Sequence, residues 1–156
     1  MIRTAAIGVA CLLLVWQPLD GVQPVQPKPD PSVEKALEQL QGVWYHVSRE
    51  VGGKEAAGES KDSLFVVRGN IIVLKTGDKV GQVGMLKIVD SKSTPKKLDL
   101  IITDGPNEGM TILCVYQVEG DVFKYCGGVK ARPASLATNA DDKEYVYLST
   151  YKKLKR

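Results

Sequence analysis

Few side chains in this sequence are suited to catalysis or metal binding. His46 is the only histidine, and two of the three cysteines, Cys114 and Cys126, lie outside the apolar N-terminal stretch. A serine nucleophile would need His46 as its base, and the sequence has no Gly-x-Ser-x-Gly turn to carry such a serine. One histidine and two cysteines at this spacing form no zinc site without carboxylates that nothing in the pattern singles out. We therefore expect a protein that is not an enzyme and that uses no metal and no cofactor.

His46 remains a candidate for contact with a ligand. It lies in a strand-like run, residues 44–51, in which alternation puts Trp44, His46 and Ser48 on one face. If Trp44 points into the interior, His46 does so too, and an inward imidazole can orient a ligand or titrate near neutral pH. The alternative is a hydrogen-bonded histidine of the core or its rim.

The tyrosines form a second candidate group because they cluster late in the sequence. Around a cavity they would supply apolar walls with hydroxyl groups, as small-molecule pockets commonly have. On the outside of a sheet they would form cross-strand pairs or a contact surface. Both placements stay open for these residues: Tyr116, Tyr125, Tyr145, Tyr147 and Tyr151.

Cys114 and Cys126 flank a turn at Glu119-Gly120-Asp121. A three-residue loop would place the two cysteines opposite each other on one face of the sheet. A two-residue loop would point them to opposite faces, because side chains alternate along a strand. The sequence leaves open a disulfide, which export would permit, and a pair of buried free thiols.

The elements that must position these residues are short apolar runs separated by Gly, Asp, Asn and Pro. No helix pattern lies between them, which disfavours parallel strand–helix–strand topology and favours an antiparallel meander. Closing such a meander removes its exposed edges. We predict an all-β fold, a small eight-stranded antiparallel up-and-down barrel with a short N-terminal helix over 31–41 that Ser32 caps. The expected strands are 44–51, 63–68, 71–75, 80–89, 98–103, 112–118, 122–126 and 145–151.

The N-terminus reads as an export signal. Arg3 precedes an apolar stretch from Ala5 to Trp16, shorter than the roughly 20 residues of a membrane-spanning helix. We predict a signal peptide over 1–21, a Pro-rich linker over 22–31 and the barrel domain over 32–156. A retained N-terminal segment, acting as a membrane anchor, is the alternative. The formal net charge of +3 is ordinary and indicates no nucleic-acid partner.

Several segments occur together in an order typical of one family. They are Leu40-Gln41-Gly42-Val43-Trp44 with Gly53-Lys54, Lys96-Lys97-Leu98-Asp99-Leu100, Ile102-Thr103-Asp104-Gly105-Pro106, Gly120-Asp121 and Arg132-Pro133. Over residues 37–155 the chain resembles a lipocalin-like domain of unknown function that is abundant in exported planctomycete proteins. It departs from that family at Leu136, where an aromatic residue is common, and at His46, where an apolar residue is usual.

The resemblance implies a small β-barrel in the cell envelope or outside the cell, with no assigned activity. It also implies that Trp44 plugs the closed end against a basic residue from near the last strand. Arg132, Lys152 and Lys153 are the candidates, and Arg132 is the expected partner.

Two hypotheses for the function follow. The first is an exported, non-catalytic barrel, secreted or in the periplasm or cell envelope, that binds a small apolar or amphipathic ligand. The second is a solid barrel whose outer face binds another envelope protein. For the first, the predicted interior wall that would contact the ligand consists of His46, Tyr116, Val118 and Phe123.

Overall fold

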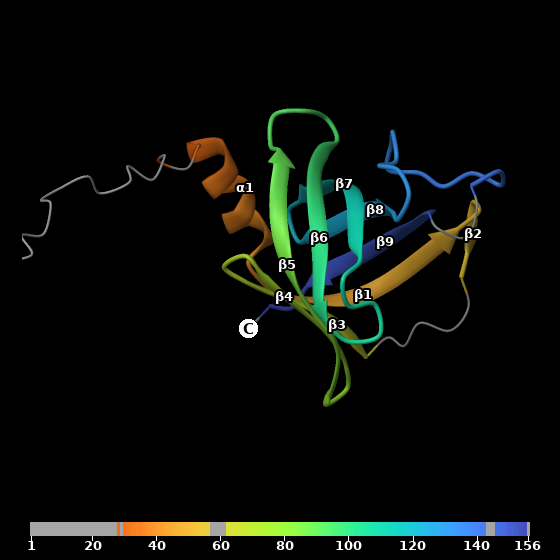
Figure 1. Cartoon of the computed structure of the whole chain (residues 1–156), viewed down its shortest axis with the longest axis horizontal. Helices are drawn as coiled ribbons and strands as arrows, with labels where there is room; N and C mark the ends of the chain where they lie inside the picture. The colour runs from red at the N-terminus through yellow and green to blue at the C-terminus, as the bar shows by residue number, and fades with distance from the viewer. Residues whose placement is uncertain (1–27, 29, 57–61, 143–145, 156) are drawn as a thin grey trace, which may run out of the picture.

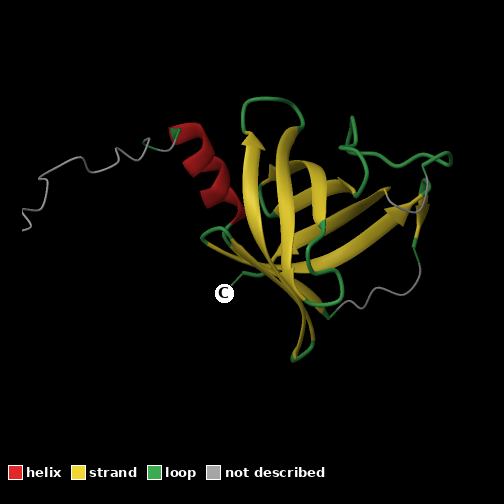
Figure 2. Ribbon diagram, viewed as in Figure 1, coloured by secondary structure: helices red, strands yellow, loops and turns green. Residues whose placement is uncertain are grey.

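The computed structural model describes residues 28, 30–56, 62–142 and 146–155. These residues form one helix and nine strands in a single antiparallel sheet, and pairing of the first strand with the last closes eight of the strands into a barrel (Figures 1 and 2). The remaining strand, β2, has two residues and pairs with the end of β1. The predicted all-β barrel is confirmed. The elements are α1 (Pro31–Leu40), β1 (Gly42–Val51), β2 (Lys54–Glu55), β3 (Ser63–Arg68), β4 (Ile71–Thr76), β5 (Lys79–Asp90), β6 (Lys96–Asp104), β7 (Thr111–Glu119), β8 (Val122–Gly128) and β9 (Val146–Lys153).

Alternation along these strands places the core inside the barrel. Trp44 pairs with Phe65 and lies inside, so residues in register with them on successive strands also face inward. One continuous cluster of buried side chains results, and it runs from α1 through the barrel. Its most buried members include Leu40, Trp44, Phe65, Val67, Ile72, Leu98, Leu100, Ile102, Cys114, Tyr116 and Phe123.

Helix α1 lies across one end of the barrel. Its buried residues are Ala36 and Leu40, and the backbone carbonyl of Leu40 accepts a hydrogen bond of 2.8 Å from Nε1 of Trp44. The Gln41 side chain, just after the helix, both donates to and accepts from the backbone of Gly69 in the turn between β3 and β4. The helix N-cap is Asp30 rather than the expected Ser32, because the Asp30 carboxylate accepts the backbone N–H of Ser32.

The loop over residues 129–142 covers part of the outer surface of the barrel. Leu136 from this loop packs against Val115, Cys126 and Leu148, which form a small second core outside the sheet. Residues Glu119 and Val122 are paired, so the turn between β7 and β8 is the two-residue Gly120-Asp121. Cys114 consequently faces the interior while Cys126 faces this outer core, and both are buried free thiols. The disulfide alternative is excluded.

Candidate functional site

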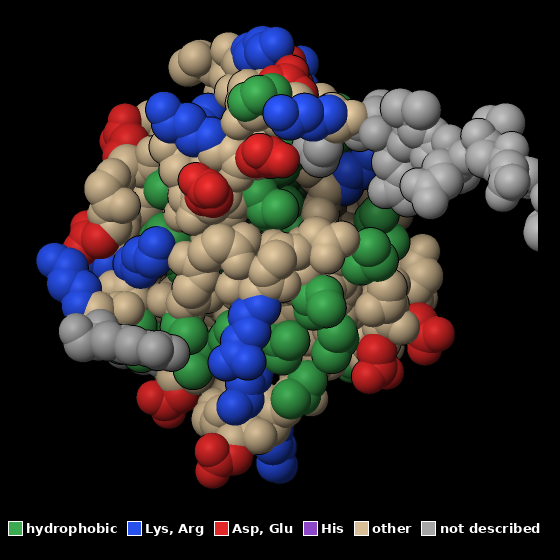
Figure 3. All heavy atoms as spheres, turned by 90° about the vertical axis from the view of Figure 1, so that its left-hand side faces the viewer, with side chains coloured by type: hydrophobic (Ala, Val, Ile, Leu, Met, Phe, Trp, Pro, Cys, Tyr) green, Lys and Arg blue, Asp and Glu red, His purple; other side chains and the backbone are tan. Residues whose placement is uncertain are grey.

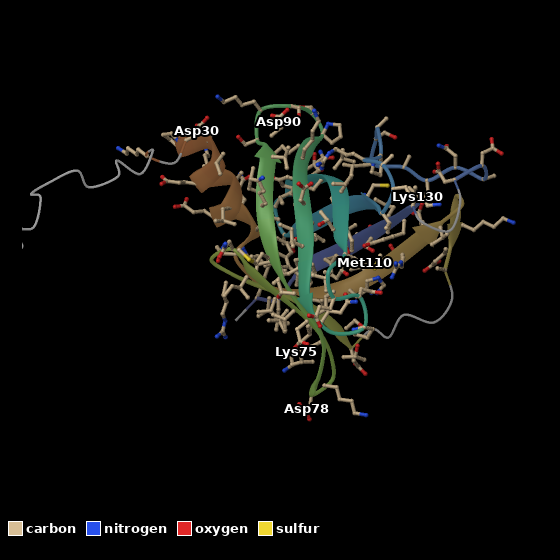
Figure 4. The ribbon with its side chains drawn as sticks, in the orientation of Figure 1. Asp30, Lys75, Asp78, Asp90, Met110 and Lys130 are labelled. Atoms are coloured by element: carbon tan, nitrogen blue, oxygen red, sulfur yellow. The ribbon has the colours of Figure 1, made fainter. Side chains whose placement is uncertain are left out.

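The end of the barrel away from α1 contains a cavity of about 640 Å³. Lys75 and Met110, labelled in Figure 4, belong to its rim. The rim also includes residues of the β6–β7 loop and Val129, while inward side chains of the strands form the walls. The lining residues with apolar or aromatic side chains are Leu74, Leu100, Ile102, Pro106, Met110, Ile112, Tyr125, Val129, Tyr147 and Tyr151, and the polar or small ones are Arg49, Ser63, Lys75, Thr76, Gly81, Gln82 and Asn107.

A shift of register in β1 turns Arg49 toward this cavity. His46 pairs with Tyr151, but Ser48 pairs with Thr150, so the register shifts at Val47. Such a bulge reverses the alternation that follows it. Arg49 is therefore opposite Ser149, which shares the inward face with Tyr147 and Tyr151. Regular alternation predicts Ser48 inside, and the bulge explains why that expectation is wrong.

The guanidinium of Arg49 stacks on Tyr147, with Cζ 4.0 Å from the ring centroid. The Tyr147 ring itself lies across Gly127, its cross-strand partner on β8. A Cβ at position 127 would come within 3.2 Å of Tyr147 Cζ and 2.9 Å of Ile112 Cγ2. Gly127 thus provides the room in which Tyr147 lies, and Tyr147 in turn supports Arg49.

The hydroxyl groups of Tyr125 and Tyr147 share a hydrogen bond inside the barrel. Burial raises the pKa of Tyr125 well above its usual value of about 10, and burial raises the pKa of Tyr147 as well. Both phenols are therefore neutral at physiological pH. Two hydroxyls that share one hydrogen bond still have one O–H to donate, so the pair can act as a donor toward a molecule in the cavity.

The four residues predicted to contact a ligand face the interior but do not line the cavity. Phe123 is completely buried and its ring centroid lies 5.5 Å from that of Trp44 and 5.7 Å from that of Phe65. Val118 pairs with Phe123, and Tyr116 is fully buried near it, with 6.4 Å between ring centroids. These three residues belong to the filled end next to α1.

His46 lies one layer closer to the cavity than Trp44. Its side chain is buried, and its ring is edge-on to Tyr151 with 5.3 Å between the centroids. Tyr151 is a lining residue, whereas His46 is not. The inward direction expected for His46 is therefore correct, but His46 lies below the cavity and does not line it, and its contact with a ligand stays a prediction.

Trp44 plugs the closed end as expected, but its basic partner is Lys153. The Lys153 Nζ lies 5.0 Å from the Trp44 ring centroid, an arrangement typical of cation–π contacts. Arg132 lies elsewhere, on the outside of β6 and β7. It donates to the backbone carbonyls of Leu98 and Cys114 and forms an ion pair with Asp99. Its role is to anchor the 129–142 loop, so its expected place beside Trp44 is wrong.

The alternation and turn signals in the sequence identify the barrel but not the open end. The structure places Tyr125, Tyr147 and Tyr151 in the wall of the cavity, which is one of the two placements that the sequence left open. Tyr116 lies in the core, and Tyr145 lies outside the described residues. Strand alternation in the sequence did not identify Arg49 as a lining residue, because its inward direction depends on the bulge in β1. The aliphatic wall was missed because Leu100, Ile102 and Ile112 look like ordinary core residues in sequence.

Two further properties of the described residues bear on the site. No three or more His, Cys, Asp or Glu side chains among them come together in a way that could hold a metal ion. Within the same part of the chain, no helix has the length and apolar character needed to cross a membrane. The predicted signal peptide lies outside the described residues.

The fold and cavity together define a small, closed antiparallel barrel of lipocalin-like, all-β type, with one plugged end and one open end. No protein-family model matches the chain, and no curated protein or solved structure matches it. The resemblance to the planctomycete-type domain stays a prediction.

Proposed function

We propose that this chain is an exported, non-catalytic barrel that holds a small apolar or amphipathic molecule in its open end. The observation that carries the proposal is the cavity of about 640 Å³. Pockets for small molecules commonly measure roughly 300–1,000 Å³ and combine apolar walls with a few polar groups. Leu100, Ile102 and Ile112 supply such walls here, and the tyrosine hydroxyls and Arg49 supply polar groups.

A variant that fills the cavity tests the proposal directly. Leu74 points inward from β4 and lines the cavity, so Leu74→Trp adds bulk where the ligand would lie. Its neighbour Val73 points outward at similar burial, and Val73→Trp is the matched control. Binding of 1-dodecanol, followed by native mass spectrometry and by displacement of a fluorescent apolar dye, should weaken at least about tenfold in Leu74→Trp. Equal binding by both variants, or no binding by the unmodified chain, would contradict the proposal.

A second function is contact between the outer surface of the barrel and an envelope protein. The observation that favours it is a pair of apolar residues, Ile71 and Met85, which are cross-strand partners and 50% and 44% exposed. Figure 3 shows one face of the molecule on which apolar side chains lie between lysines and arginines. If this surface binds a protein, Ile71→Lys should abolish capture of one defined partner in a pull-down without changing dodecanol binding.

A further inference from the structure

Tyrosine rings with a defined mutual geometry line part of the cavity. The ring planes of Tyr125 and Tyr151 are parallel to within 8°, with 6.0 Å between the centroids. The Tyr147 ring stands at 77° to that of Tyr125, with 5.8 Å between the centroids. All three residues belong to the lining of the cavity. The wall therefore contains two parallel rings and a third ring perpendicular to them.

The parallel rings are held in place from the core side. The Phe123 ring lies 5.6 Å from that of Tyr125 and 6.0 Å from that of Tyr151, at interplanar angles of 30° and 28°. The Phe65 ring contacts the same two tyrosines, at centroid distances of 6.1 Å and 5.5 Å. Phe65 and Phe123 are completely buried. The two tyrosine rings are thus ordered before any ligand arrives, and a ligand that contacts them loses little free energy in fixing them.

These contacts form one aromatic cluster that reaches from the closed end to the cavity. Trp44 contacts Phe123, and Phe123 contacts both Tyr125 and Tyr151, which line the cavity. Aromatic rings favour offset-stacked or edge-to-face contacts, so a further ring gains from meeting either a face or an edge of these tyrosines. A saturated group in the same place gains only from burial of apolar surface. The cavity is therefore suited to hold the next ring of the cluster.

We infer that the ligand is a flat aromatic molecule, with its ring system against Tyr125 and Tyr151 and its remaining surface along the aliphatic wall of β6 and β7. This inference rests on the proposed function and names the ligand class. Leu100 and Ile102 in that wall contact aliphatic and aromatic ligands alike. The tyrosine rings are the part of the lining that distinguishes the two classes.

Two probes that differ in aromaticity alone test the inference. They are 2-naphthol and decahydro-2-naphthol, which share a carbon skeleton and a hydroxyl group. Both are uncharged at neutral pH, so the comparison does not depend on the charge around the cavity. Isothermal titration calorimetry with the whole chain should show 2-naphthol binding about 3- to 10-fold more tightly, the range expected for aromatic pairing. The saturated probe is at least as hydrophobic, so apolar burial alone does not predict this preference.

Variants locate the preference. Tyr125→Leu should lose most of it, while binding of the saturated probe shows that the variant is folded. Tyr125→Phe keeps the ring and should keep the ratio of the two affinities, even if the lost hydroxyl weakens both. The matched control is Tyr116→Leu, the same change at a buried residue of the closed end, which should leave the ratio as it is. All variants share the apolar N-terminal residues, so differences between them report on the folded barrel.

A second measurement needs no variant. The ring current of bound 2-naphthol should shift the NMR signals of the Tyr125 and Tyr151 ring protons. Decahydro-2-naphthol has no ring current and should shift them much less. The ring signals of Tyr116, at the closed end, should stay in place with either probe. If Tyr125→Leu binds neither probe, these shifts decide the inference.

The outcomes separate the inference from the proposed function. Equal affinity for the two probes, tighter binding of the saturated one, or a preference that survives Tyr125→Leu in full overturns the inference and leaves the proposed function standing. A preference lost equally in Tyr116→Leu also overturns it, because the loss would then not come from the cavity wall. No binding of 2-naphthol, decahydro-2-naphthol or 1-dodecanol overturns both the inference and the proposed function.

Discussion

The two ends of the barrel are made by the same strands but have opposite interiors. Next to α1, Trp44, Phe65 and Phe123 are completely buried, and their rings fill the space between the strands. At the other end, inward residues of the same strands, including Arg49 and Leu74, surround a cavity. The backbone differs as well. Register shifts occur between His46 and Ser48, between Leu74 and Lys75, and between Val83 and Gly84, and one further shift, between Ile88 and Asp90, lies at the end next to α1.

These shifts help to explain how one barrel can be filled with side chains at one end and contain a cavity at the other. At the closed end, pairing around Trp44, Phe65 and Phe123 keeps large side chains at facing positions, so they pack as in a protein core, and the shift between Ile88 and Asp90 lies beyond them, next to α1. Bulges bend a strand and increase its twist, and they are common at the rims of barrels. Three of the four shifts lie toward the open end and help to shape it, whereas side-chain volume fills the closed end. Changes at the two ends should accordingly have different effects on stability and on binding.

The largest expected effect is at the closed end. Trp44→Ala removes a fully buried indole and its hydrogen bond to Leu40, and should lower the free energy of unfolding by about 3–5 kcal/mol. Urea denaturation followed by circular dichroism measures this loss. Trp44→Phe keeps most of the volume and should lose clearly less. Dodecanol binding by the folded fraction should be unchanged, and a loss of binding larger than the loss of stability would show that the two ends are not independent.

The anchor of the 129–142 loop comes next. Arg132→Met removes the ion pair with Asp99 and two hydrogen bonds to backbone carbonyls, which should cost about 1.5–3 kcal/mol of stability. Adding Asp99→Asn removes the carboxylate left without its partner and should restore part of the loss. A double variant whose loss equals the sum of the two single losses would contradict the assigned pairing. Val129 at the start of this loop lines the cavity, so the same variants show whether the loop supports the open end.

At the open end, Gly127→Ala should affect stability and binding together. The added Cβ would lie too close to Ile112 and Tyr147, so one of them must move, at a cost of about 1–3 kcal/mol. Ile112 and Tyr147 both line the cavity, so moving either changes its wall, and dodecanol should bind more weakly. The matched control for stability is Gly81→Ala, where the nearest atom to an added Cβ is the Leu74 carbonyl oxygen at 3.6 Å. If the two variants lose the same amount of stability, the packing role of Gly127 is refuted.

The closed end is also the part of the molecule that sequence predicts well. The helix and eight barrel strands were expected within a few residues of their observed bounds, because period-two alternation and turn residues such as Gly69-Asn70 are local signals. The inward direction of Trp44 follows from the same alternation. Even there the basic partner was misassigned, because Arg132 and Lys153 both lie near the last strand in sequence and only the path of the 129–142 loop separates them.

The open end was not predictable in the same way. A bulge depends on how two strands pair, so nothing in residues 44–51 alone shows that Arg49 rather than Ser48 points inward. The place of Tyr147 depends on Gly127, a residue 20 positions earlier that becomes its neighbour only after folding. A cavity arises from space that side chains leave unfilled, which no single residue type encodes.

The smallest effect gives the sharpest comparison, because the same chemical change should have opposite signs at the two ends. The Tyr116 hydroxyl at the closed end is buried and has no hydrogen-bond partner among the described residues. Tyr116→Phe should therefore raise the free energy of unfolding by about 1 kcal/mol. Tyr147→Phe breaks the hydrogen bond with the buried Tyr125 hydroxyl and should lower it by about 1 kcal/mol. Urea denaturation at neutral pH measures both changes, and equal signs would contradict the contrast.

Alkaline pH tests the buried state of Tyr116 independently. Burial raises the pKa of Tyr116 to about 12, from about 10 in the unfolded chain. Since the folded state favours the neutral phenol, this contribution to stability is complete below about pH 10 and is lost as the pH rises from about 10 through about 12. Tyr116→Phe should thus flatten the decline of the unfolding free energy in this window, without abolishing it, because burial also raises the pKa values of Tyr125 and Tyr147. An unchanged decline would mean that the Tyr116 hydroxyl is hydrated in the folded protein, and the closed end would then be less completely filled than its packed aromatic rings imply.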